Sequence, residues 1–162
     1  MTQLLLGRFV GSTPVTLFRI QSAAKVNLRL KSAQLAAGRS SFDISSTDGF
    51  VHPCNEPAFL GPNGMSIRPQ GRMLAIISAT IRTRARVYEI PAGTRIPSEL
   101  VLLHEHNDLY ALQPAERMTI AQCNAALTAF LVQDSVRLHK SVADFNAAHP
   151  WSRELAGCEL PI

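Results

Sequence analysis

The sequence lacks the cysteine patterns of disulfide-rich and zinc-ribbon proteins. Its 162 residues contain three cysteines, Cys54, Cys123 and Cys158, and no CxxC pair. A sparse, odd set of this kind is typical of a reducing, cytoplasmic compartment, although the count leaves room for one disulfide. We expect Cys123, which lies in a helical pattern, to be a buried core residue.

Long apolar segments are also absent. No run approaches the ~20 apolar residues of a membrane-spanning helix, so we expect no membrane association. The first residues carry no basic segment, and Arg8 interrupts their short apolar run, so we expect no cleaved signal peptide. Delivery by a secretion route that needs no such peptide stays open.

Lysine is scarce, and arginine carries the basic charge. The chain has 13 Arg against 3 Lys; residues 1–99 hold 12 Lys+Arg and 5 Asp+Glu, and residues 100–162 hold 4 and 7. Arginine binds phosphates and carboxylates through a planar, bidentate fork, so this bias suggests a phosphorylated ligand. A GC-rich genome and a solvated basic face would explain it equally well.

Length and composition predict one globular domain. Domains usually have roughly 100–200 residues. A content of 46% apolar and 17% charged residues is typical of folded globular proteins. We expect a single domain over residues 1–162. Its core would span about 15–146, and residues 147–162 would form a surface tail from which Trp151 docks back.

Periodicity predicts an α+β fold. The expected elements are a strand at 15–20, a helix at 23–37, a long loop at 38–70, a helix at 73–81, strands at 84–90, 100–104 and 109–113, and a helix from 118 to about 146. Thr119 would cap the last helix, and residues 105–108 would form a hairpin turn. A long irregular loop in a small domain is often functional, so the ligand is expected there.

Within that loop, residues 61–69 (GPNGMSIRP) are the most distinctive. Asn63 and Gly64 permit unusual backbone angles and close approach of a ligand to main-chain N–H groups. Ser66 adds a hydroxyl and Arg68 a fork of donors, a combination suited to a diphosphate or a ribose. The alternative is a tight turn with Arg68 on the surface.

Arg19 is unusual because it lies in the middle of a predicted apolar strand. It shares a strand face with Leu17 and Gln21, away from Phe18 and Ile20. A buried guanidinium is costly unless it meets an anion, so Arg19 indicates either a cleft or an edge strand with one wet face.

Other kinds of site are poorly supported. His104 and His106 have a metal-like spacing, but no third ligand follows at a fixed interval, so we expect no metal. Walker, Rossmann and Ser-His-Asp patterns are missing. Basic residues do not alternate with aromatic ones as in single-strand binders, so nucleic acid is not the expected partner.

Seven segments in order resemble one family, the small ADP-ribosyltransferase-fold toxins related to a type VI secretion effector of Pseudomonas and its fungal relatives. The segments are residues 17–19, 48–53, 59–69, 88–97, 100–106, 110–115 and 118–120. The resemblance spans roughly residues 15–133. It implies a split β-sheet core with flanking helices, NAD as a substrate, a cytosolic site of action in a target cell and, in bacteria, an immunity partner.

The resemblance also implies roles for individual residues. Catalytic roles fall to Arg19, Ser66 and Gln113, and NAD binding to Asn63, Gly64, Arg68 and Tyr110. The reaction would cleave the nicotinamide–ribose bond through an oxocarbenium-like transition state.

The sequence departs from the family pattern in two respects. Leu109 stands where relatives commonly have a His before the Tyr, and no clear catalytic Glu is present, although Glu89, Glu105 and Glu116 are options. Two alternatives therefore stay open, a non-catalytic binding module that keeps the fold and an Arg-rich nucleic-acid binder.

Overall fold

A computed structural model describes residues 3–81 and 84–157 of the chain. The strands are β1 (Gly7–Phe9), β2 (Leu17–Gln21), β3 (Phe50–Val51), β4 (Met65–Ile67), β5 (Arg86–Ile90), β6 (Leu100–His106), β7 (Leu109–Pro114), β8 (Met118–Thr119) and β9 (Arg137–His139). The helices are α1 (Lys31–Ala36), α2 (Arg72–Thr80), α3 (Ile120–Leu131), α4 (Val142–Ala148) and α5 (Trp151–Gly157).

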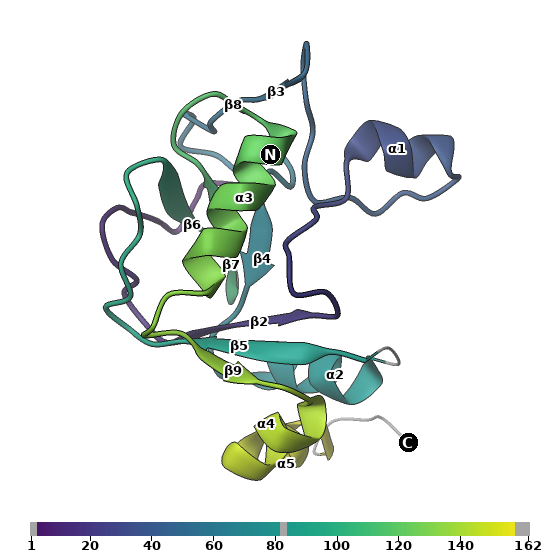
Figure 1. Cartoon of the computed structure of the whole chain (residues 1–162), viewed down its shortest axis with the longest axis vertical. Coiled ribbons are helices and arrows are strands. Elements are labelled where there is room, and N and C mark those ends of the chain that lie inside the picture. The colour runs from purple at the N-terminus through teal and green to yellow at the C-terminus, as the bar shows by residue number, and fades with distance from the viewer. Residues whose placement is uncertain (1–2, 82–83, 158–162) are drawn as a thin grey trace.

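The strands form three antiparallel sheets, which confirms the expected α+β fold with a split sheet (Figure 1). One sheet has the order β1-β6-β7-β4, the second β2-β5-β9, and the third pairs β3 with β8. A bridge joins the first two: the Phe18 N–H donates to the Arg68 carbonyl (2.7 Å), and the Arg68 N–H donates to the Phe18 carbonyl (3.1 Å). The end of β4 therefore lies directly beside β2.

The larger hydrophobic cluster, called here the main core, lies between the four-stranded sheet, α3 and one face of the three-stranded sheet. Leu102 and Leu112 face it from the hairpin, Leu17 and Ile90 from β2 and β5. Cys123 is fully buried in this cluster, as predicted, and burial raises the pKa of its thiol to about 11.

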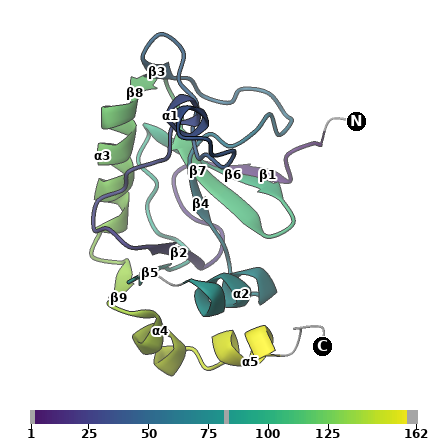
Figure 2. The ribbon, with the colours of Figure 1, turned by 90° about the vertical axis from the view of Figure 1, so that its right-hand side faces the viewer.

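The smaller cluster, called here the second core, lies against the opposite face of the three-stranded sheet. Its buried members are Phe18, Leu74, Val87 and Phe145. Figure 2 shows α2, α4 and α5 on this side of β2 and β5, and α3 on the other. Strand alternation explains the arrangement, because successive residues of β2 and β5 contribute to different cores.

The C-terminal helices belong to the second core. The ring of Trp151, at the start of α5, lies 6.0 Å from the ring of Phe18 and 5.8 Å from that of Phe145. The prediction that Trp151 docks back is therefore confirmed. Cys158 lies outside the described residues.

The expected helix from residue 118 to about 146 is wrong in its second half. Thr119 caps α3 as predicted, with a reciprocal capping box to Gln122, but the helix ends at Leu131. A turn then leads to β9, which pairs with β5, and a separate helix follows. Leu138, which lies within the expected helix, is 41% exposed on this edge strand.

The expected helix at 23–37 is also mostly wrong. Only Lys31–Ala36 is helical, and α1 projects from the rest of the ribbon (Figure 1). Residues 26–28 are extended because α3 satisfies their backbone: the Val26 N–H donates to Thr128 Oγ1 (2.8 Å) and the Leu28 N–H to Asn124 Oδ1 (3.1 Å). Val26 and Leu28 are buried and Asn27 exposed, which is the alternation of a strand.

The expected loop at 38–70 contains two short strands, β3 and β4. In β4, Met65 and Ile67 are buried in the main core, while Ser66 between them is exposed. Within the described residues, none of the helices has the length and apolarity to span a membrane.

Candidate functional site

A cavity of about 260 Å³ lies where β2 and β4 meet, over α2. Its apolar wall includes Leu74 and Ile77 of α2, and its polar lining consists of Arg19, Arg29, Asp43, Ser66 and Arg68. The structure thus brings together three of the seven residues predicted for the site, Arg19, Ser66 and Arg68. The bridge between Phe18 and Arg68 places them side by side.

Arg19 lies on β2 and turns toward β4. Its Nε donates to Gln21 Oε1 (3.1 Å), and one terminal nitrogen donates to the Ser66 carbonyl (3.1 Å). Both partners are neutral, and the salt bridges between described residues leave Arg19 without a carboxylate. Burial lowers the pKa of its guanidinium, and arginine side chains stay protonated in proteins. Arg19 is thus a half-buried cation with donor capacity left for an anion.

Arg29 and Asp43 form a bidentate ion pair at the rim of the same cavity. Arg29 donates through Nε to Asp43 Oδ2 (3.0 Å) and through a terminal nitrogen to Oδ1 (2.9 Å). Burial alone would raise the pKa of Asp43, but these hydrogen bonds outweigh it and lower that pKa. The pair also raises the pKa of Arg29 through the hydrogen bond to Asp43. Asp43 is therefore ionised, and both of its carboxylate oxygens accept hydrogen bonds from Arg29.

Neither Arg29 nor Asp43 was predicted for the site. Arg29 lies in the expected helix at 23–37, and Asp43 lies in the expected loop at 38–70. The available signal was their charge combined with the strand-like alternation around Val26 and Leu28. Only the fold shows that both lie beside Arg19.

Ser66 of β4 and Arg68, the residue after β4, are two residues apart and both line the cavity. The Ser66 side chain is exposed to the cavity and, within the described part of the chain, makes no hydrogen bond. Arg68 donates to Asp108 Oδ1 (2.9 Å) in the hairpin turn between β6 and β7, which fixes the direction of its guanidinium. The hydroxyl is free to meet a ligand, whereas the Arg68 fork is partly engaged.

Three further predicted residues, Asn63, Gly64 and Gln113, lie together outside this cavity. Asn63 Nδ2 donates to the His52 carbonyl (2.9 Å) and weakly to Gln113 Oε1 (3.4 Å). The Gly64 N–H donates to the Asp43 carbonyl (2.9 Å). A Cβ at Gly64 would lie 2.3 Å from the Leu112 carbonyl oxygen, so glycine permits close approach to β7.

Gln113 is 1% exposed, although register places it on the sheet face that carries Ser66. Through Asn63, Gln113 holds the segment before β4 in place. The hydrogen bond from Gly64 fixes the backbone of Asp43, whose side chain lines the cavity. Asn63, Gly64 and Gln113 therefore support the segments that line the cavity but do not line it themselves.

Tyr110 lies on the opposite face of the four-stranded sheet. Its ring stacks on His104 at 4.1 Å and lies 6.3 Å from that of Phe9, in the main core. It is 8% exposed, and burial raises the pKa of its hydroxyl. The structure does not bring Tyr110 to the cavity.

The three glutamates considered for catalysis also lie outside the cavity lining. Glu89 contacts two histidines on the far side of β5. Glu105 is 3% exposed at an irregularity in β6, and burial raises its pKa to about 7. Glu116 lies near the start of α3. Asp43 is the carboxylate that does line the cavity.

A larger cavity of about 600 Å³ lies beside residues 84–86 and 140–142. Its lining includes Arg84, Arg86 and Lys140, and none of the predicted site residues. The pairing of Arg19 with Ser66 makes the smaller cavity the better candidate, because there two elements far apart in sequence converge on one point.

The chemical character of the smaller cavity is that of an anion site. Three guanidinium groups line it against one carboxylate, and Arg19 has no ion pair with another described residue. Arginine forks match phosphate oxygens, and a partly buried setting strengthens the attraction. A free hydroxyl, that of Ser66, lies beside them. This arrangement suits a phosphorylated, hydroxyl-bearing ligand.

Comparison with known proteins agrees with the fold. No curated protein matches the chain. Residues 15–141, which include all the polar lining of the cavity, match the sequence model of a family described as Tse2 ADP-ribosyltransferase toxin. The match spans most of the chain, so this protein belongs to the Tse2 ADP-ribosyltransferase toxin family.

Proposed function

We propose that this toxin uses NAD as its substrate, cleaving the nicotinamide–ribose bond and transferring ADP-ribose to a macromolecule. The NAD diphosphate would lie in the cavity lined by Arg19, Ser66 and Arg68. The observation that carries the proposal is the half-buried guanidinium of Arg19, which among the described residues donates to neutral groups alone, beside a Ser66 hydroxyl that bonds none of them. An anionic ligand would complete its coordination.

The residues around the cavity would have different roles in binding NAD and in cleaving it. Arg19 would bind a phosphate, and Arg68, oriented by Asp108, would support the diphosphate from the other side. Fixing the diphosphate orients the ribose, and positioning of this kind lowers the barrier to bond cleavage. Ser66 would hydrogen-bond a ribose or nicotinamide group. Positive charge develops on the ribose in the transition state, and the ionised Asp43 is the nearby group of opposite sign.

The size of the cavity limits what it would hold. Its volume of about 260 Å³ lies slightly below the ~300–1,000 Å³ of typical ligand pockets. It would enclose the central part of a dinucleotide and leave the ends on the adjoining surface. The segment from Ser66 to Arg68 would then form one wall of the binding site.

Family membership suggests the setting of the reaction. A toxin of this type would act in the cytosol of a target cell after delivery by a secretion system, and its producer would hold a cognate immunity protein. NAD is abundant in the cytosol, which fits consumption there.

The proposal is tested by inducing the chain in a bacterium and following growth and NAD content over time. Arg19→Ala is expected to restore growth and NAD levels. With purified protein it should weaken NAD binding by roughly 10–100-fold, since hydrogen bonds to charged groups contribute about 1.5–3 kcal/mol. Arg19→Lys should rescue only in part, because lysine keeps the charge but loses the fork.

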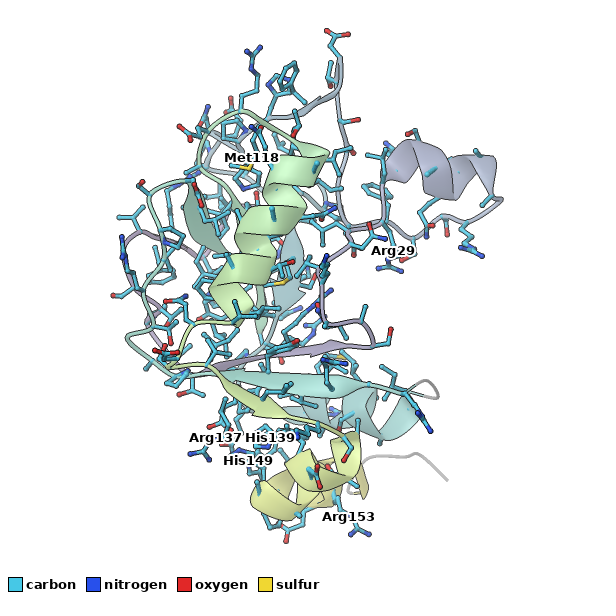
Figure 3. The ribbon with its side chains drawn as sticks, in the orientation of Figure 1. Arg29, Met118, Arg137, His139, His149 and Arg153 are labelled. Atoms are coloured by element: carbon cyan, nitrogen blue, oxygen red, sulfur yellow. The ribbon has the colours of Figure 1, made fainter. Side chains whose placement is uncertain are left out.

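Arg153→Ala is the matched control, since Arg153 is an exposed arginine on α5 (Figure 3). It should leave toxicity and NAD binding unchanged. If Arg19→Ala is folded, fully toxic and binds NAD like the wild type, the proposal fails.

One observation favours a second function, a non-catalytic binding module. Asp43, the acidic residue of the cavity, is held in a bidentate ion pair, and none of the three glutamates considered lines the cavity. A module of this kind would bind NAD weakly, release no nicotinamide and still bind a partner protein. Nicotinamide release by the purified chain would decide between the two functions.

A further inference from the structure

Three ligand-type side chains meet at one point beside the second core. Glu89 comes from β5, His139 from β9 and His149 from the residue after α4. Glu89 Oε1 lies 2.9 Å from His139 Nε2 and 2.7 Å from His149 Nε2. Figure 3 shows the two histidines close together beneath β9. Their potential ligand atoms all lie within 4.8 Å of one another.

We propose that Glu89, His139 and His149 form a binding site for a divalent transition metal of the zinc type. Two imidazole nitrogens and one carboxylate oxygen are a recurrent protein ligand set for such ions. The three residues, 89, 139 and 149, are far apart in the sequence and do not form a spacing motif typical of metal ligands. This departs from the expectation drawn from the sequence, where only His104 and His106 had a metal-like interval.

To accept an ion, the three ligand atoms would move to an even spacing: Glu89 Oε1 away from the two nitrogens, and the nitrogens, which lie within 4.8 Å of each other, to the same separation. In a tetrahedral zinc site with bonds of about 2.0–2.1 Å, neighbouring ligand atoms lie roughly 3.3 Å apart. Glu89 Oε1 would therefore move about half an ångström from each nitrogen. Each ring proton would leave Nε2, the nitrogen that faces the carboxylate, for Nδ1 of the same ring or for solvent.

The surroundings hold the two rings in place. The His149 ring lies 5.6 Å from that of Phe18 and 5.8 Å from that of Trp151, and the His139 ring lies 5.8 Å from that of Phe145. Rings fixed by packing lose little freedom when they bind an ion. The His139 side chain is 7% exposed, whereas His149 and Glu89 are 23% and 17% exposed, so the cluster opens on their side. An ion can enter there, and a water molecule can fill a remaining position.

The consequence of binding would be structural. The ion would join the edge strand β9 and the junction of α4 with α5 to β5, the centre of the three-stranded sheet. β5 pairs with β2, and Phe18 lies opposite Glu89 in that pair. A metal here would stabilise the strand that carries Arg19 without entering the cavity.

The alternative is a purely hydrogen-bonded cluster. Two imidazoles that donate to one carboxylate oxygen already satisfy it, and the hydrogen bonds from both histidines outweigh the effect of burial and lower the pKa of Glu89. Such a cluster would hold α4 and α5 in place without an ion. The two states differ in their response to added metal.

The test is to strip the full chain with a chelator and titrate it with Zn²⁺, following bound metal and thermal unfolding. The wild type should bind one equivalent, and at a hundredfold excess over Kd its unfolding midpoint should rise by roughly 5–10 °C. Co²⁺ should give the visible absorption of a tetrahedral site. His149→Ala should lose the shift and the absorption, and Glu89→Gln should weaken binding while keeping the hydrogen-bond acceptor.

His106→Ala is the matched control, because His106 packs against Phe59 outside the cluster. It should respond to Zn²⁺ like the wild type. No Zn²⁺-dependent shift in the wild type, or an equal shift in Glu89→Gln and the wild type, would overturn the proposal. Since Glu89→Gln retains the acceptor, a folding defect is not expected to hide the result.

Discussion

The two cores of this protein are stabilised by different kinds of contact. The main core is a mainly aliphatic cluster in which Leu102, Leu112 and Phe130 are almost completely buried. The second core has fewer buried members and adds aromatic and histidine rings, with Glu89 at its edge. Burial of apolar surface is the main stabilising interaction in the main core, whereas ring contacts and hydrogen bonds add to it in the second core.

This difference separates two tasks. The main core holds β4, and with it Ser66, through Met65 and Ile67. The second core holds β2 through Phe18, next to Arg19. The cavity lies between the two cores. Its geometry therefore depends on the mainly aliphatic main core and on the second core, whose stability depends on solution conditions.

The largest effect is expected from truncating one aromatic residue in each core. Phe130→Ala and Phe145→Ala should each lower the free energy of unfolding by about 3–5 kcal/mol, since both side chains are fully buried. Trp151, the single tryptophan, packs on Phe145 and reports on the second core. In Phe145→Ala the fluorescence midpoint in urea should fall below the far-UV circular dichroism midpoint, and in Phe130→Ala the two should coincide.

Leu138→Ala serves as the control, since Leu138 is 41% exposed on β9. It should change stability by less than about 0.5 kcal/mol. Coincident fluorescence and circular dichroism transitions in Phe145→Ala would show that the two cores unfold as one unit.

The next effect concerns pH and has opposite signs for two carboxylates. Burial raises the pKa of Glu105 from 4.5 to about 7, and this side chain has no hydrogen bond or ion pair to the described residues. The unfolded chain ionises first, so stability should fall as pH rises from about 4.5 to about 7, by roughly 3 kcal/mol. Glu105→Gln should flatten this dependence and stabilise the protein above neutrality.

Glu89 should behave in the opposite way. Its pKa is lowered, so its contribution is present above the ordinary value of 4.5 and is lost as pH falls below it. Urea unfolding across this range, for the wild type, Glu105→Gln and Glu89→Gln, separates the two contributions. A Glu105→Gln profile that parallels the wild type would contradict the assignment.

The smallest effects are expected at two helix caps. Thr119 and Gln122 form a reciprocal capping box on α3, whereas Ser141 makes a single 3.0 Å bond to the Asp144 N–H on α4. Alanine at an N-cap costs about 0.5–2 kcal/mol. Thr119→Ala should therefore destabilise more than Ser141→Ala, measured by urea unfolding. The reverse order would indicate that α4 is the more critical helix.

Much of the fold could be predicted because it rests on local patterns. β2, α2, β5, the β6–β7 hairpin and the start of α3 follow from alternation, helical spacing and the Thr119 cap. The predictions failed where tertiary contacts override these patterns. Residues 26–28 extend because Asn124 and Thr128 of α3 supply their partners, and β9 forms because β5 offers an edge.

The site was predictable only in part. Arg19, Ser66 and Arg68 stood out as a charged residue in an apolar strand and as polar donors among turn residues, and they line one cavity. Tyr110 and Gln113, whose roles were implied by the resemblance, lie outside the cavity, because strand alternation puts Tyr110 on the opposite sheet face and Gln113 is buried. Charge and the alternation around Val26 and Leu28 do not reveal that Arg29 and Asp43 meet, because their ion pair is a tertiary contact at the cavity rim.

The sequence by itself determined the α+β class, the arginine bias and the family, since these depend on composition, periodicity and the order of short motifs. Only the tertiary structure decided which charges meet. A guanidinium, a carboxylate or an imidazole acts over a few ångströms, and chain folding alone brings Arg19 to Ser66 and residues 89, 139 and 149 to one point.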